Sequence, residues 1–414
     1  MTDRERYDYL KSVAAEVLEQ CTFERQCEYF GKSEIMRVAV PSGDGKYPSF
    51  WVRDCAMMAE SGLFSREDCR RYIQIIIRHG INGPEMKTLK NGLSVPPYAV
   101  ADHINYDGKP VFFPGTYSSG DDQGSGRCGF LPPLCDNYLF LSMAAEYLLQ
   151  ADDSEVRSEF EALAEQVWNA YCIDPETGLC TCDVENRAVD WGFCDQIVKT
   201  GKLLFPSLLR FRAARLLAKA LKNAEFDRHA DKLAHRINGT FFEKETGWML
   251  SATGIGKQPD VWGTACAICF GVLVGDDAKA AANALLAAYR NGESVKDGYI
   301  RHIPKSRDFS DDSAWECAPA VAKGNYQNGA WWSTATGWYA YALNTVSPEA
   351  ARNLIDDFIR HTRKHRAQGA PYEFFRDDTG EPSGFNYGTS AALPFAWFEK
   401  MPGNMRIDKG KTRC

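Results

Sequence analysis

The chain has 414 residues with a formal net charge of −7, and 44% of the residues are apolar. One folded body of this size buries roughly 75% of its unfolded surface, so the fold needs no disulfide or metal to hold it together. The lack of a Lys/Arg block argues against nucleic acid as a partner, and no apolar run approaches the ~18 residues of a membrane span.

The first residues, MTDRERYDYLKSV, lack the apolar core of a signal peptide, so we expect a cytoplasmic protein. In that compartment the 14 cysteines are expected to be reduced, half-buried thiols. Cys266 and Cys269 form a CxxC pair inside an apolar run, where core packing is a better explanation than metal binding.

Twelve helices are predicted, and two kinds alternate along the chain. Helices of the first kind are apolar on one face only, as Tyr7, Leu10 and Val13 indicate. Several begin at a capping residue, and Ser347 stands before Pro348 in this way. In chain order the six amphipathic helices are predicted at 4–20, 66–79, 155–172, 224–242, 277–290 and 348–366.

Helices of the second kind are apolar on all sides. In chain order they are predicted at 51–63, 136–149, 202–221, 261–274, 330–345 and 387–398. The last three contain no charged residue. Because a helix that is apolar all round must be buried all round, these six are predicted to form an inner ring wrapped by the amphipathic set.

Loop lengths indicate how the two sets connect. Connections from an inner to the next outer helix are short, whereas those from an outer to the next inner helix are long. Since successive helices are antiparallel, all the long loops then lie at one end. We therefore predict an all-α fold, an (α/α)6 barrel of six hairpins with long loops on one face, as a single domain over 1–414. Two separate helical domains would need a linker that the sequence lacks.

The long loops place aromatic residues beside carboxylates and amides, as in YPSFWVRD at 47–54 and DFSDDSAWECAP at 308–319. Aromatic faces cover the apolar C–H patches of a sugar ring, while carboxylates and amides bind its paired hydroxyl groups. The loops therefore favour a small carbohydrate as the substrate. No cofactor is predicted. A loop calcium at Asp308, Asp311 and Asp312 is an open alternative, although their spacing matches no strong calcium loop, and no metal is assigned.

This layout resembles the six-hairpin glycosidase superfamily, which includes glucoamylases, trehalases, α-L-rhamnosidases and exo-α-mannosidases. WVRD at 51–54 is similar to the WxRD of glucoamylases and exo-mannosidases. The DxxxxD at 190–195 is similar to the DxxxxE of rhamnosidases, with aspartate in place of the glutamate. The resemblance covers nearly the whole chain in layout, but no single family is matched throughout.

The resemblance implies a carboxylic acid before the third inner helix and a carboxylate base before the last. Asp195 is the first choice for the general acid and Asp190 the second; packing against Trp191 would keep such a group protonated. Both aspartates could instead brace the loop. Glu373 is the first choice for the general base, with Glu316 as the competitor, and an exposed loop position is the alternative for Glu373.

The resemblance also implies that Arg53 and Asp54 bind hydroxyl groups of the innermost sugar. The alternative is an internal Arg–Asp pair at the barrel rim. Asp136 and Asn137 could bind substrate or cap the second inner helix. The other candidate substrate-binding residues are Trp51, Trp191, Glu316, Gln327, Asn328, Trp331, Trp332 and Tyr387. For the tryptophans at 331 and 332, the alternative is plain core.

Taken together, these features predict an inverting, exo-acting glycoside hydrolase, with the two carboxyl groups ~6.5–9.5 Å apart across the pocket. An (α/α)6-barrel sugar epimerase is an alternative, but it would need paired histidines, and only His103 and His302 lie in the long loops. A non-catalytic carbohydrate-binding protein is the other alternative, and a lyase is a smaller possibility.

Overall fold

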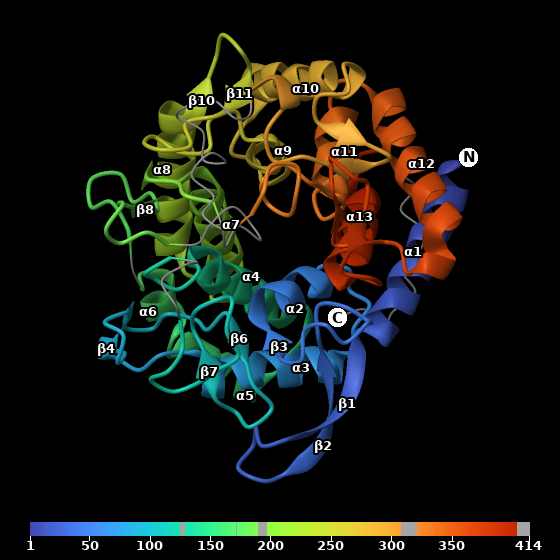
Figure 1. The fold of residues 1–414 in the computed structure, drawn as a ribbon. Coiled ribbons are helices and arrows are strands. Elements are labelled where there is room, and N and C mark those ends of the chain that lie inside the picture. Colours follow the sequence, from blue (N-terminus) through green and yellow to red (C-terminus); the bar gives the residue numbers. More distant parts are fainter. Residues whose placement is uncertain (125–128, 171, 189–196, 308–320, 404–414) are drawn as a thin grey trace.

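The computed structural model describes residues 1–124, 129–170, 172–188, 197–307 and 321–403. Twelve predicted helical segments appear as two concentric sets around one axis (Figure 1). Four predicted site residues, Asp190, Trp191, Asp195 and Glu316, lie outside the described residues.

The inner ring consists of six almost completely buried helices. They are α2 (Val52–Ala59), α4 (Leu134–Gln150), α7 (Leu204–Ala220), α9 (Val261–Cys269), α11 (Thr336–Asn344) and α13 (Gly388–Lys400). Each packs against the next in this order, and α13 packs against α2. The contacts therefore close a ring, which confirms the predicted (α/α)6 barrel.

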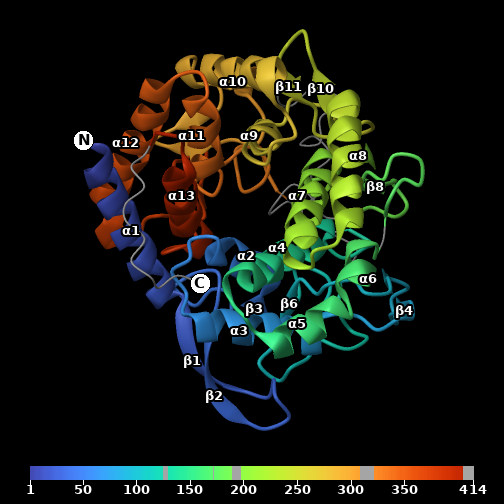
Figure 2. The same cartoon turned by 180° about the vertical axis from the view of Figure 1, so that it is seen from behind.

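The outer set covers the inner ring with amphipathic helices. It comprises α1 (Asp3–Gln20), α3 (Arg66–Ile75) with a π-helical turn (Ile76–Gly80), α5 (Ser154–Glu161), α6 (Ala164–Trp168), α8 (Ala224–Phe241), α10 (Gly275–Arg290) and α12 (Pro348–His365). Figure 2 shows α1 beside α12 and α13, with which it is in contact. The N-terminal helix thus packs against the last hairpin and completes the outer layer.

Capping explains several helix starts. The Thr2 hydroxyl accepts a hydrogen bond from the Glu5 amide at 3.2 Å, while the Glu5 carboxylate accepts one from the Thr2 amide at 2.7 Å. The Ser347 hydroxyl accepts from the Ala350 amide at 3.3 Å, directly before Pro348.

The prediction of one helix over 155–172 is wrong in extent. The structure has two shorter helices there, α5 and α6, and α6 ends at Trp168. Tertiary partners take its final carbonyl groups. The Asn137 amide donates to the Val167 carbonyl at 2.8 Å, and the Arg210 guanidinium donates to the Trp168 carbonyl. Three inner helices are also shorter than predicted: α2 ends at Ala59, α9 ends at Cys269, and α11 begins at Thr336.

Short strands tie the long connections together. All the strands that the structure describes lie between an outer helix and the next inner one. One five-stranded antiparallel sheet joins β12 (Val295–Lys296), β13 (Tyr299–Ile300), β14 (Trp331–Trp332), β15 (Phe374–Phe375) and β16 (Pro382–Ser383). A three-stranded sheet joins β3 (Phe50–Trp51), β6 (His103–Ile104) and β7 (Pro110–Val111).

Four two-stranded pairs complete the described strands. They are β1 (Thr22–Cys27) with β2 (Glu34–Ala39), β4 (Lys87–Thr88) with β5 (Ser94–Val95), β8 (Thr181–Cys182) with β9 (Gly201–Lys202), and β10 (Phe242–Glu243) with β11 (Trp248–Met249). Each of the two larger sheets contains strands from two different connections. Loop residues that are distant in sequence are therefore held beside one another.

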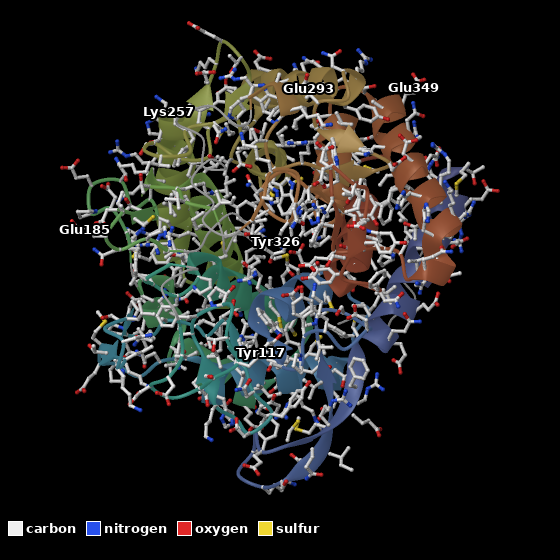
Figure 3. The ribbon with its side chains drawn as sticks, in the orientation of Figure 1. Tyr117, Glu185, Lys257, Glu293, Tyr326 and Glu349 are labelled. Atoms are coloured by element: carbon white, nitrogen blue, oxygen red, sulfur yellow. The ribbon has the colours of Figure 1, made fainter. Side chains whose placement is uncertain are left out.

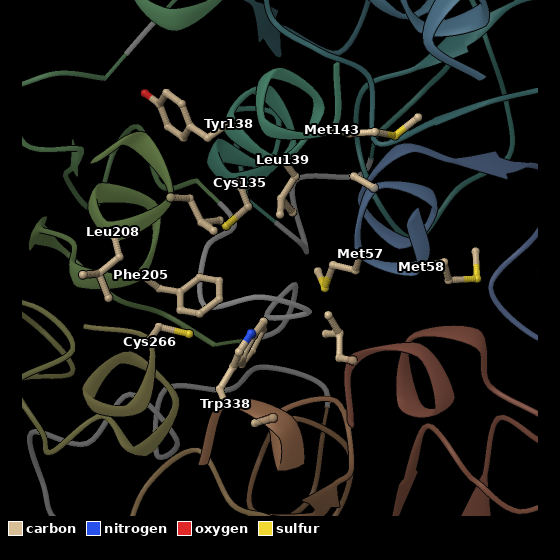
Figure 4. Packing of buried hydrophobic residues seen from close by; sticks show 14 of the residues in the cluster. Met57, Met58, Cys135, Tyr138, Leu139, Met143, Phe205, Leu208, Cys266 and Trp338 are labelled. Atoms are coloured by element: carbon tan, nitrogen blue, oxygen red, sulfur yellow. The ribbon is translucent and has the colours of Figure 1, made fainter. Parts of the chain in front are cut away.

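Side chains of the inner helices fill the barrel axis (Figure 4). Met57, Leu139, Phe205 and Trp338 are all buried there, and the Phe205 and Trp338 ring centroids are 6.1 Å apart. None of the described helices is long and apolar enough to cross a bilayer. The centre of the barrel is therefore filled by packed side chains.

Candidate functional site

A cavity of about 160 Å³ lies at the loop-bearing end, where α2 and α13 begin. It is lined by Pro41, Tyr47, Trp51, Arg53, Asp54, Gly115, Thr116, Tyr117, Tyr326, Glu373 and Tyr387. Figure 3 shows Tyr326 near the centre of the ring and Tyr117 on the side of β3 and β7. Five residues predicted from the sequence therefore line one cavity: Trp51, Arg53, Asp54, Glu373 and Tyr387.

Glu373 is buried at the end of a strand rather than exposed in a loop. Its side chain is 2% exposed, and its backbone amide donates to the Gly384 carbonyl at 2.8 Å. A Cβ atom at Gly384 would lie only 2.4 Å from the Glu373 Cβ, so the β15–β16 turn packs tightly against this side chain. The turn thereby fixes the position of the carboxylate.

Two neighbours from the connection before α2 act on the Glu373 carboxylate. The Tyr47 hydroxyl donates a hydrogen bond to Oε2 at 2.7 Å, and Lys46 Nζ lies 4.0 Å from the same oxygen. Burial, reinforced by the charge of Glu373, raises the pKa of Tyr47 well above its ordinary value. Tyr47 therefore keeps its proton at neutral pH and remains a donor.

Arg53 is the cation at the centre of a buried acidic cluster. Its side chain is 5% exposed; Nη1 donates to Asp136 Oδ1 at 2.9 Å, and Nη2 donates to Asp102 Oδ1 at 3.2 Å. Burial raises the pKa of Asp136 well above its usual range, with the charge of Asp102 adding to the effect and Arg53 opposing it. One guanidinium thus compensates two carboxyl groups, which holds the starts of α2 and α4 together.

Asp54 faces a different partner. Its Oδ1 accepts a hydrogen bond from the Tyr387 hydroxyl at 2.9 Å, across 333 positions of sequence. Burial raises the pKa of Asp54 to about 6, although Arg53 and Tyr387 both act to lower it. The predicted internal Arg–Asp pair therefore exists, but Arg53 makes it with Asp136 and Asp102 rather than with Asp54.

Aromatic rings form one wall of the cavity. The Trp51 ring stacks on His103 with centroids 4.5 Å apart, and Tyr47 and Tyr117 approach its edge at 5.6 and 6.2 Å. His103 Nδ1 lies 2.9 Å from Asp102 Oδ2, which fixes the imidazole beneath the indole. Trp51 is thus braced from behind and presents a flat apolar face of the kind that stacks on a sugar ring.

Asp136 and Asn137 lie behind the cavity, and neither is among the lining residues that the structure describes. Asp136 is 0% exposed and acts on the site through Arg53. The Asn137 side chain accepts from the Val100 amide and donates to the Val167 carbonyl, both at 2.8 Å. These contacts are structural, since they anchor two backbone segments to α4.

The four candidates at 327–332 are buried, and none is among the described lining residues of the cavity. Trp331 and Trp332 are at most 1% exposed, and Trp332 Nε1 donates to the Tyr326 carbonyl at 3.2 Å. Asn328 Nδ2 donates to the Val321 carbonyl at 2.7 Å, and Gln327 is fully buried. Of the four, Trp332 holds Tyr326, which does line the cavity, through the indole hydrogen bond and a ring contact with centroids 5.2 Å apart.

Sequence reasoning missed Tyr47, Tyr117, Tyr326 and Asp102 as individual residues. The three tyrosines stand in aromatic-rich loops, so the composition of those loops was an available indication. Asp102 had no such indication, because its role depends on the distance from Arg53, which is 49 positions away.

The histidines that an epimerase would need are covered by tryptophans. His302 is fully buried and stacks on Trp262 with centroids 3.9 Å apart, while His103 lies beneath Trp51. Burial, helped by Lys199 and Arg301, lowers the pKa of His302 well below its ordinary value. Neither histidine is among the described lining residues of the cavity.

A larger hollow of about 900 Å³ lies between the connections that lead to α4, α7 and α9. Its described lining is largely apolar, with Pro96, Pro97, Cys172 and Val184, and Asp183 is the one carboxylate in it. The smaller cavity holds Asp54 and Glu373 and therefore has the better chemistry for acting on a sugar.

Comparison with known proteins supports the fold. Neither a protein-family model nor a curated protein sequence matches this chain. Among solved structures, the GH63 mannosylglycerate hydrolase from Thermus thermophilus in complex with glucose is similar at a TM-score of 0.56 and 15% identity, over 94% of this chain and 99% of that one.

Two other solved structures show the same architecture. Cellobiose 2-epimerase from Bacillus thermoamylovorans is similar at a TM-score of 0.60 and 10% identity, over 96% of this chain and 99% of that one. A rhamnosidase from Klebsiella oxytoca with rhamnose bound is similar at a TM-score of 0.54 and 12% identity, over 96% of this chain. This chain spans 64% of that rhamnosidase. At these identities the similarity establishes a shared barrel, seen in both glycosidases and an epimerase.

Proposed function

We propose that residues 1–414 form one catalytic domain that hydrolyses a small glycoside or oligosaccharide from its end, with inversion at the anomeric carbon. The observation that carries the proposal is the setting of Glu373. Its buried carboxylate accepts a hydrogen bond from Tyr47 at 2.7 Å and lines a cavity together with Trp51, Arg53 and Asp54. A cavity of about 160 Å³ suits one sugar residue better than a polymer, which favours exo action.

In the proposed reaction Glu373 is the general base. It accepts a proton from a water molecule as the water oxygen forms a bond to the anomeric carbon. Asp195 is proposed as the general acid, which gives its proton to the departing glycosidic oxygen as the glycosidic bond breaks. Asp190 remains the second choice for the acid and Glu316 the competing base.

The remaining lining residues are proposed to hold the sugar. Trp51 supplies a flat surface for one face of the ring, and its backing by His103 at 4.5 Å keeps that surface in place. Arg53 and Asp54 offer a donor and an acceptor for hydroxyl groups, and no cofactor takes part in this scheme. The solved structures of this fold include proteins bound to glucose and to rhamnose, which agrees with a carbohydrate substrate.

The sugar epimerase remains the main rival because one such enzyme has this fold. The burial of His103 and His302 beneath tryptophans argues against it. A non-catalytic carbohydrate-binding protein is the second rival.

The test is a screen of aryl glycosides covering both anomers of common sugars, with Glu373→Gln and the exposed Glu381→Gln as a matched pair. Glu373→Gln should lower kcat/KM by about 10²–10⁴-fold, and Glu381→Gln should not change it. Proton NMR of the first-formed sugar should show inverted configuration. Retention would reject inversion, deuterium uptake without cleavage would indicate an epimerase, and sugar binding without turnover would indicate a binding protein.

A further inference from the structure

Tyr117 is the most exposed of the aromatic residues that the structure describes around the cavity at Glu373. It is 42% exposed and lies outside the apolar core, whereas the other four are buried or half-buried. These four are Tyr47, Trp51, Tyr326 and Tyr387. Tyr117 lines the cavity and is also open to solvent, so its ring lies at the mouth (Figure 3).

The rings of the wall follow one another from Glu373 to Tyr117. The Tyr47 hydroxyl lies 2.7 Å from Glu373 Oε2, and the centroids of Tyr47 and Trp51 are 5.6 Å apart. The centroids of Trp51 and Tyr117 are 6.2 Å apart. In an inverting reaction the leaving group departs on the side of the sugar opposite the base. Tyr117 is at the end of the wall that lies away from the base, where a leaving group is expected.

The position of Tyr117 is fixed although its ring is exposed. Asn105 Nδ2 donates a hydrogen bond to the Tyr117 carbonyl at 2.9 Å, and Asn105 Oδ1 accepts one from the Ser49 hydroxyl at 2.8 Å. Ser49 directly precedes β3, the strand that ends at Trp51. The ring itself contacts His103, with centroids 5.2 Å apart. Tyr117 is therefore held beside Trp51 before any ligand binds.

We propose that Tyr117 binds the leaving group of the substrate, and that this group contains a ring with a flat apolar face. The proposal rests on the hydrolase proposed above. A cavity of about 160 Å³ holds one sugar residue, so the part of the substrate beyond the glycosidic bond lies at the mouth. There the Tyr117 ring covers the face of a second sugar or of an aromatic alcohol. A leaving group without a ring gains nothing from this contact.

The test compares leaving groups on the same sugar. The probes are the 4-nitrophenyl glycosides and the glycosyl fluorides of glucose, mannose and rhamnose in both anomeric forms, together with disaccharides of these sugars. The variants are Tyr117→Ala, Tyr117→Phe and, as the control, Tyr9→Ala on the outer helix α1. The measured quantity is kcat/KM for the ring-bearing substrate divided by kcat/KM for the fluoride, and thermal unfolding verifies that each variant is folded.

Tyr117→Ala should lower this ratio by about tenfold, the size of one lost ring contact, whereas Tyr117→Phe and Tyr9→Ala should retain it. A loss that extends to the disaccharides identifies a sugar as the leaving group, and a loss confined to the nitrophenyl glycosides identifies an aromatic one. An equal loss on fluorides and ring-bearing substrates would mean that Tyr117 only supports Trp51 and would overturn the proposal. An unchanged ratio in Tyr117→Ala, or a fall in Tyr117→Phe, would overturn it as well.

Failure of the hydrolase itself gives a different result. If the wild type cleaves none of these substrates, the proposed function is rejected, and calorimetry with 4-nitrophenyl thioglycosides and the free sugars tests Tyr117 separately. The thioglycosides should bind more tightly than the free sugars, and Tyr117→Ala should remove the difference. Thioglycosides that bind no more tightly than the free sugars would overturn the role of Tyr117.

Discussion

Replacing Tyr47 with phenylalanine removes one hydroxyl group from the surroundings of Glu373. The ring still fills its place against Trp51 and Tyr387, which it approaches at 5.6 and 6.1 Å. What is lost is a donor 2.7 Å from Oε2 of a carboxylate whose side chain is 2% exposed. Only the hydrogen bond changes, so its effect on the proposed base can be isolated.

The size of the effect follows from the charge on the acceptor. A hydrogen bond to an ionised group contributes about 1.5–3 kcal/mol, which corresponds to about 1–2 pKa units. Lys46 remains 4.0 Å away, but its side chain is 47% exposed, so water screens most of its influence. The donor favours the ionised carboxylate, and its removal must therefore raise the pH at which the base becomes active.

The assay is kcat/KM against pH for the wild type, Tyr47→Phe and Tyr341→Phe. Tyr341 is a half-buried tyrosine whose ring packs on Trp397 at 5.4 Å, and it is not among the residues that line the cavity. The acid limb should move to higher pH by at least about one unit in Tyr47→Phe and should not move in the control. A profile that keeps its acid limb in Tyr47→Phe would refute the role of this hydrogen bond.

Three further predictions concern the buried charges and the proposed acid. Arg53→Met leaves Asp102 and Asp136 buried without their cation, so the free energy of unfolding should fall by about 3–5 kcal/mol in denaturant titrations. Asp54 has a pKa of about 6 in the fold against an ordinary 3.8, so the folded state binds more protons and stability falls as the pH rises from about 4 to 6. Asp54→Asn should abolish this loss of about 3 kcal/mol, and identical pH slopes in both proteins would contradict the reasoning. Asp195→Asn should slow substrates with poor leaving groups by about 10²–10⁴-fold while sparing activated aryl glycosides, and an equal loss on both would remove it as the acid.

The barrel could be predicted from the sequence because the features that indicate it lie close together along the chain. Apolar faces repeat within one helix, caps such as Ser347 stand beside the turns they stabilise, and loop lengths alternate along the chain. Burial of an all-apolar helix such as α9 then follows from the hydrophobic effect alone. The predicted extent was wrong at 155–172, where distant groups bind the backbone, as at Val167, whose carbonyl accepts a hydrogen bond from Asn137.

The candidate site could be predicted only in part. Trp51, Arg53, Asp54, Glu373 and Tyr387 were identified because their residue types are unusual at the starts of inner helices or match a known motif. Their partners could not be assigned in the same way.

Only the tertiary structure pairs Tyr47 with Glu373 across 326 positions, and Tyr387 with Asp54 across 333. A helix can be predicted because apolar residues recur every three or four positions along it. A hydrogen bond between two loops leaves no periodic pattern in the chain. The sequence by itself predicted the buried inner helices and the end that carries the long loops, and closure of the ring decided which carboxyl group meets which tyrosine or arginine.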